Sequence, residues 1–276
     1  MKTLFASGCS FTETNMLSYV YPEHRNSTCW PEELVKLFKN KWKVCNYAKS
    51  GMGNDFIATT FFEHIGNYGD PDLVVIAWSN SSRLSISGNG DEETWLKYGD
   101  YTFDPIWAYH QRHKLGAYWK HDKHGGVWNE FAFKYYEKFY PDSYVNFIVK
   151  NWLKNVFIIQ DYCKMHNVPY AFSQAIQPVI TGLKEVSDQL KHNKGIKNYL
   201  INTFINHNLE DKINENNFIG YPTYQEIGGF NLENLVRENK KFQIGVGEAH
   251  PNNEAHVHIG KLYYDNIKKN YDITDF

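Results

Sequence analysis

The chain has 276 residues, and its 42% hydrophobic content is enough for a sizeable core. Its formal net charge of -2, with 12 histidines taken as neutral, gives no basic footprint for a nucleic acid or an anionic membrane surface. The apolar run after Lys2 is too short for a signal peptide and no window approaches a membrane span, so we expect a cytoplasmic protein. The four cysteines show no CxxC spacing, which favours free thiols over a disulfide framework or a zinc site.

Strand and helix signals alternate along the chain. Short apolar runs predict strands at 4–6, 42–45, 73–78 and 168–173. Helix signals predict helices at 31–38, 54–64 and 144–166, the second of them capped by Asn54. This alternation is typical of a parallel sheet with helices on both faces. We therefore expect a single α/β domain over 1–276, a flavodoxin-like three-layer α/β/α sandwich with a central, mostly parallel sheet.

Two long insertions interrupt this alternation. The first, at about 83–142, is rich in aromatic residues, and the second, at about 176–245, is polar and rich in asparagine. The first contains Trp95, Trp107, Trp119 and Trp128. Two interpretations of these rings stay open: they contact substrate, or they pack the insertion's own core or an oligomer interface. Because the first insertion leaves the carboxyl edge of the 73–78 strand, we predict that it lies over the site.

Small polar residues follow each of the first three predicted strands. Ser10 comes just after Gly8, which permits a sharp turn off the first strand and leaves the hydroxyl at the carboxyl edge of the sheet. Gly51 ends the polar stretch after the second strand, and Asn80 follows the third. Near the C-terminus, His250 is preceded by an acid at 248. A hydroxyl, a backbone N–H, an amide and a histidine are the groups that acyl transfer requires.

These stretches resemble the four blocks of the SGNH hydrolase superfamily, also called the GDSL family, which carry Ser, Gly, Asn and His in this order. The resemblance covers about residues 1–82 and 244–268. It implies Ser10 as the nucleophile, His250 as the base and Glu248 as the residue that orients the base. It further implies an oxyanion hole formed by the N–H of Ser10, the N–H of Gly51 and the side-chain amide of Asn80.

The chain departs from the family pattern at several positions. Cys9 stands where the family often has Asp, and Trp78 and Ser81 replace the usual Gly and Asp of the third block. The family's acid commonly lies three residues before the histidine, where this chain has Gly247, and Glu248 is the nearest acid. Either Glu248 or a backbone carbonyl therefore orients His250.

Two rival assignments are weaker. Cys9 is a rival nucleophile, but neighbours along an extended turn point in opposite directions, so only one of them faces His250, and we expect Ser10. A metal cluster of Glu248, His250, His256 and the nearby His258 is not expected. His250 and His256 are six residues apart and do not share a helix face as an i, i+4 pair would.

The sequence thus predicts a serine esterase that removes a short acyl group from a carbohydrate or another small alcohol in two steps. The candidate substrate contacts are Trp78, Trp95, Trp107, Trp119 and Trp128. No cofactor, metal, nucleic acid or membrane partner is expected, and a homo-oligomer stays open. Two alternatives are an O-acyltransferase that uses the same site on a sugar and a catalytically inactive module that keeps the fold for binding or assembly.

Overall fold

The computed structural model describes residues 1–14, 28–87, 100–103, 138, 142–176, 198–245, 249–274 and 276. A five-stranded sheet lies at the centre of this part of the chain, in the order β2-β1-β3-β6-β7. Its strands are β1 (Lys2–Gly8), β2 (Trp42–Asn46), β3 (Leu73–Trp78), β6 (Tyr170–Gln174) and β7 (Phe218–Ile219). All neighbouring pairs are parallel. This is the flavodoxin-like strand order, so the predicted fold class is confirmed.

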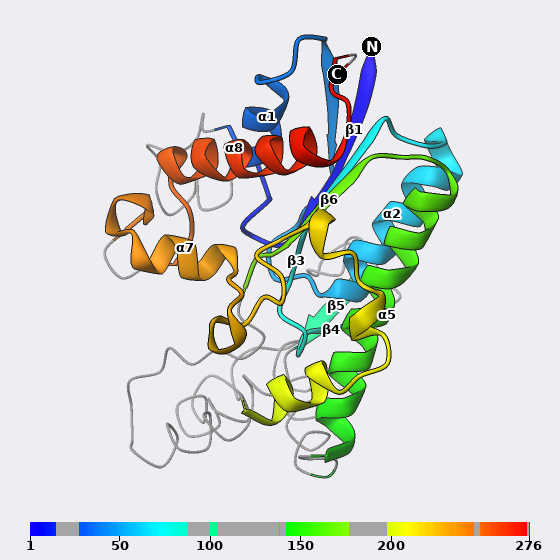
Figure 1. Cartoon of the computed structure of the whole chain (residues 1–276), viewed down its shortest axis with the longest axis vertical. Coiled ribbons are helices and arrows are strands. Elements are labelled where there is room, and N and C mark those ends of the chain that lie inside the picture. Colours follow the sequence, from blue (N-terminus) through cyan, green and yellow to red (C-terminus); the bar gives the residue numbers. More distant parts are fainter. Residues whose placement is uncertain are drawn as a thin grey trace, which may run out of the picture.

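Helices cover both faces of the sheet (Figure 1). One face carries α1 (Trp30–Val35) and α8 (Asn253–Asn270), and the other carries α2 (Asn54–Tyr68) and α5 (Asp142–Met165). Gly260 lets α8 approach α1 closely, because a Cβ there would lie 3.0 Å from the backbone nitrogen of Leu34. No helix in the described residues is long and apolar enough to cross a membrane.

Alternating side chains of the strands divide the core into two halves. From β1, Leu4 and Ala6 pack towards α1 and α8, whereas Phe5 packs towards α2 and α5. This alternation is the period of two that any extended strand imposes. The last residue of β3, Trp78, is completely buried in the half under α2 and α5, where its ring meets Phe172 edge-on.

The insertion at 176–245 contributes secondary structure of its own. Its described residues, 176 and 198–245, add β7 to the edge of the sheet and form α7 (Leu232–Glu238), a helical segment over 198–205 and four short 3-10 helices. Those 3-10 helices are η3 (Glu210–Lys212), η4 (Glu215–Asn217), η5 (Gln225–Ile227) and η6 (Lys240–Phe242). The described part of 83–142 includes an antiparallel pair, β4 (Leu84–Ser87) and β5 (Asp100–Phe103).

Asn54 does not cap α2, which corrects the sequence-based prediction. Gly53 is the N-cap residue, and Asn54 begins the helix. Its side chain turns inward instead, where Nδ2 donates to the Ser79 carbonyl at 3.2 Å and Oδ1 accepts from the Ser79 N–H at 2.8 Å. The N–H and the carbonyl of the completely buried Ser79 both need hydrogen-bond partners, and the Asn54 amide supplies one to each. The contact joins the start of α2 to the end of β3.

Candidate active site

The turn after β1 places the side chains of Cys9 and Ser10 in different surroundings. The N–H groups of Thr12 and Glu13 both donate to the Cys9 carbonyl, at 2.9 and 3.1 Å, so the chain coils directly after the strand. Gly8 is required here, since a Cβ at this position would lie 2.4 Å from Thr12 Oγ1. Cys9 is completely buried in the core under α1 and α8, whereas Ser10 Oγ lies within hydrogen-bond distance of His250. The two side chains therefore diverge.

Ser10 and His250 meet across 240 positions of sequence. The Nε2 atom of His250 lies 2.9 Å from Ser10 Oγ, and the His250 ring packs against Phe11 with 5.3 Å between ring centroids. For Nε2 to accept the Ser10 proton, the neutral imidazole must carry its own proton on Nδ1. With that tautomer, the pair has the geometry of a nucleophile and its general base.

Local contacts hold the His250 loop in place. The Ile244 N–H donates to the His250 carbonyl at 3.1 Å, and Gln243 forms an antiparallel bridge with Pro251. Asn252 then caps α8 by accepting from the Ala255 N–H at 3.0 Å. His250 is thereby fixed just before a capped helix, which limits how far its ring can move from Ser10.

Asn80 lies in the turn after β3, next to the turn that carries Ser10, because β1 and β3 are neighbours in the sheet. Its Oδ1 accepts from both the N–H and the hydroxyl of Ser82, each at 2.8 Å. A backbone N–H can only donate, so this contact fixes which end of the amide is oxygen. The Nδ2 group is buried and has no hydrogen-bond partner among the residues that the structure describes. A buried donor left unpaired costs free energy, and an acceptor atom of a bound molecule would relieve that cost.

Gly51 lies at the end of the loop after β2, with φ at +81°. Among the described residues, no acceptor takes a hydrogen bond from the backbone N–H of Ser10 or of Gly51. The Nδ2 group of Asn80 has no acceptor among these residues either. The donors that the resemblance assigns to an oxyanion hole are thus all without an acceptor in the part of the chain that the structure describes. Preorganised donors of this kind stabilise developing negative charge.

Several candidates from the sequence fall outside this arrangement. Glu248, Trp95, Trp107, Trp119 and Trp128 lie outside the described residues. Trp78 is completely buried in the core, which corrects the prediction that it contacts substrate. The physical reason is strand alternation, which turns the last side chain of β3 under α2 and α5 rather than into the site.

Histidines near the C-terminus do not form a metal centre in the described residues. No group of three or more histidine, cysteine or acidic side chains there is arranged to hold a metal ion. His256 instead lies against α1, with Nδ1 3.9 Å from Cys29 Sγ, and His258 packs on Phe242 with 5.1 Å between ring centroids.

Burial raises the pKa of the Cys29 thiol well above its ordinary value, so this thiol stays protonated.

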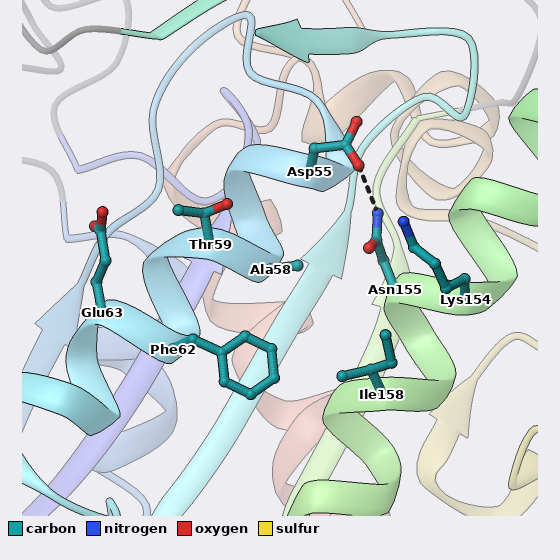
Figure 2. A pocket seen from close by; sticks show the side chains of 8 residues that line it. All are labelled: Asp55, Ala58, Thr59, Phe62, Glu63, Lys154, Asn155 and Ile158. Atoms are coloured by element: carbon teal, nitrogen blue, oxygen red, sulfur yellow. Dashed lines mark hydrogen bonds between the residues drawn. The ribbon is translucent and has the colours of Figure 1, made fainter. Parts of the chain in front are cut away.

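A separate hollow of about 630 Å³ lies between α2 and α5 (Figure 2). Apolar and charged side chains line it, and Asn155 Nδ2 donates to Asp55 Oδ1 at 3.1 Å across it. Neither Ser10 nor His250 lines this hollow. All of its lining residues belong to α2 and α5, so it is separate from the Ser10–His250 pair.

Glu13 is a residue near the site that the sequence analysis did not single out. Its Oε2 accepts from both the N–H and the hydroxyl of Ser50, the residue before Gly51. The spacing Ser10-x-x-Glu13 resembles a capping box, a signal that singles out a carboxylate next to a turn. That signal does not reveal the partner, because Ser50 lies on another loop.

Comparison with solved structures finds similar layouts at low sequence identity. The psychrotrophic esterase EstA from Pseudoalteromonas sp. is 13% identical with a TM-score of 0.43, over 98% of this chain and 98% of that one. Axe2, an acetylxylan esterase from Geobacillus stearothermophilus, is 12% identical with a TM-score of 0.43, over 99% of this chain and 95% of that one. No curated protein matches the chain.

A protein-family model matches the part of the sequence that lies between Ser10 and His250. The match begins after Ser10 and ends before His250, so it includes Gly51 and Asn80 but neither member of the hydrogen-bonded pair. It covers well over half of the chain. The chain belongs to the family of unknown function DUF6071, whose model matches residues 14–194.

Proposed function

We propose that this protein is a serine esterase in which Ser10 is the nucleophile and His250 the general base. The observation that carries the proposal is the 2.9 Å contact between Ser10 Oγ and His250 Nε2 at the carboxyl edge of a parallel sheet. Open α/β sheets bind ligands at this edge, next to the point where the strand order reverses. Here β1, with β2 on one side and β3 on the other, is the strand at that point.

The first step forms an acyl-enzyme. His250 Nε2 takes the Ser10 proton as Oγ attacks the ester carbonyl carbon, and the carbonyl π electrons move to oxygen. The N–H groups of Ser10 and Gly51 and the Asn80 amide donate to that oxyanion. When the carbonyl re-forms, the bond to the alcohol oxygen breaks, and His250 returns the proton to the departing alcohol.

The second step releases the acid. A water molecule gives a proton to His250 as its oxygen attacks the acyl carbon, and collapse of that intermediate breaks the bond to Ser10 Oγ, which regains the proton. Glu248 is the proposed partner of His250 Nδ1. A short acyl group on a carbohydrate or another small alcohol stays the predicted substrate.

A serine-reactive fluorophosphonate probe tests the proposal without knowledge of the natural substrate. We expect covalent labelling at Ser10 in the wild-type protein, no labelling of Ser10→Ala, and loss of activity of that variant on a short-chain acetyl ester. Heat-denatured wild-type protein serves as the control, because labelling at Ser10 requires the folded Ser10–His250 pair. Folded wild-type protein that does not label contradicts the proposal and favours a non-catalytic binding module.

A further inference from the structure

Two loops are tied together beside the Ser10–His250 pair: the turn that carries Ser10 and the loop over 47–51 after β2. The side chain of Asn46 makes the first tie, donating to the Thr12 carbonyl at 2.7 Å while accepting from the Ala48 N–H at 3.0 Å. The Lys49 N–H then donates to the Gly8 carbonyl at 3.2 Å. These hydrogen bonds anchor the start of the 47–51 loop to the turn that carries Ser10.

Glu13 forms the contact between the two loops that lies nearest to Gly51 in the sequence. One carboxylate oxygen, Oε2, accepts from the Ser50 N–H at 2.7 Å and also from the Ser50 hydroxyl. Glu13 is itself held by its N–H, which donates to the Cys9 carbonyl at 3.1 Å. Hydrogen bonds to an ionised acceptor are roughly twice as strong as neutral ones. The backbone and the side chain of Ser50 are thus both fixed to the turn that carries the nucleophile.

We propose that Glu13 is a positioning residue for the oxyanion hole, because fixing Ser50 sets the direction of the Gly51 N–H. This inference rests on the proposed function. The N–H before Gly51 points to Glu13, and the N–H after it, on Met52, donates to the Lys49 carbonyl at 3.3 Å. Gly51 is exposed and has no side chain to pack. The hydrogen bonds of Ser50 and Met52 on either side of it therefore set the direction of the Gly51 N–H.

Two variants of Glu13 test the inference. In Glu13→Ala the Ser50 donors lose their acceptor, so we expect kcat for ester hydrolysis to fall about 10- to 100-fold, as a misplaced oxyanion donor does. KM should stay within about twofold, because the lost stabilisation acts on the transition state. Glu13→Gln keeps one neutral acceptor oxygen and should retain part of the activity. Amide hydrogen exchange over 50–52 should become faster in Glu13→Ala, a readout that is independent of catalysis.

Glu32 offers a matched control. Its Oε1 accepts from Thr14 Oγ1 at 2.8 Å, so it lies beside the same turn and carries the same charge but does not contact Ser50. We expect Glu32→Gln to leave kcat and exchange at 50–52 unchanged. Ser50→Ala removes only the hydroxyl contact, and combining it with Glu13→Ala should cost no more than Glu13→Ala alone, because both changes act on one interaction.

The outcomes separate this inference from the proposed function. If the wild type does not label at Ser10 with the fluorophosphonate, the proposed function fails and the positioning role fails with it. If the wild type labels and Glu13→Ala labels and turns over equally fast, only the positioning role is overturned. A kcat loss in Glu32→Gln equal to that in Glu13→Gln also overturns it, since charge alone then explains the effect. Should Glu13→Ala not fold, wild-type kcat in both Glu13→Gln and Ser50→Ala overturns the inference.

Discussion

Replacing Asn80 by alanine tests the proposed oxyanion hole directly. The substitution removes one proposed oxyanion donor, and loss of such a donor typically lowers kcat by about 10²–10³, or about 2.7–4 kcal/mol. It also removes the oxygen that accepts from the N–H and the hydroxyl of Ser82, and each of these buried donors loses an acceptor at a cost of about 1–3 kcal/mol. The buried Nδ2 group disappears at the same time, and relief of its own penalty of about 1–3 kcal/mol offsets part of that cost. The free energy of unfolding should therefore fall by about 1–3 kcal/mol.

Ser82→Ala is the matched comparison for Asn80→Ala. It removes one of the two donors to Asn80 Oδ1 but leaves the Nδ2 donor in place, so stability should fall by about 1 kcal/mol while kcat falls less than about tenfold. Initial rates on a short-chain acetyl ester and urea unfolding measure the two quantities. If Asn80→Ala keeps kcat/KM within tenfold of the wild type while Ser10→Ala is inactive, the assignment of Asn80 to the oxyanion hole is refuted.

Three other substitutions test the structural reasoning. Gly8→Ala forces a Cβ against Thr12 Oγ1 at 2.4 Å, so we expect the nucleophile turn to shift and fluorophosphonate labelling at Ser10 to slow by at least about tenfold; unchanged labelling contradicts this account. Gly260→Ala crowds the contact between α8 and α1 and should lower the free energy of unfolding by about 1–3 kcal/mol, as seen by urea denaturation. Hydrogen bonds from Tyr162 and then His166 lower the pKa of Asp70 below its ordinary value. Because the folded-state pKa lies below the unfolded one, this contribution is fully present above the unfolded pKa and is lost as the pH falls through the folded pKa. Asp70→Asn should thus destabilise by up to about 1 kcal/mol at pH 7, given its exposed position, and progressively less in urea titrations below about pH 4; a difference that stays constant with pH refutes the assignment.

The order β1, α1, β2, α2, β3, α5 and β6 could be predicted from the sequence, because each of these elements depends on local pattern. The uniformly apolar 73–78 run is the buried central strand β3, and Pro31 with the acids after it falls in the first turn of α1. β7 could not be predicted, because two residues carry no periodicity and only pairing with β6 makes them a strand. The side chain of Asn54 could not be placed from the sequence either. It hydrogen-bonds the backbone of Ser79, which follows β3, instead of capping α2.

At the site, the sequence by itself determined which chemical groups are available: a hydroxyl on Ser10 after the first strand, an amide on Asn80 after the third and a late His250. Only the tertiary structure decided that Ser10 Oγ and His250 Nε2 lie 2.9 Å apart and that Cys9 is turned into the core. The physical reason is distance along the chain. Turn and strand preferences act over a few residues, whereas the contact between His250 and Ser10 exists only once the parallel sheet has formed and α8 has packed against α1.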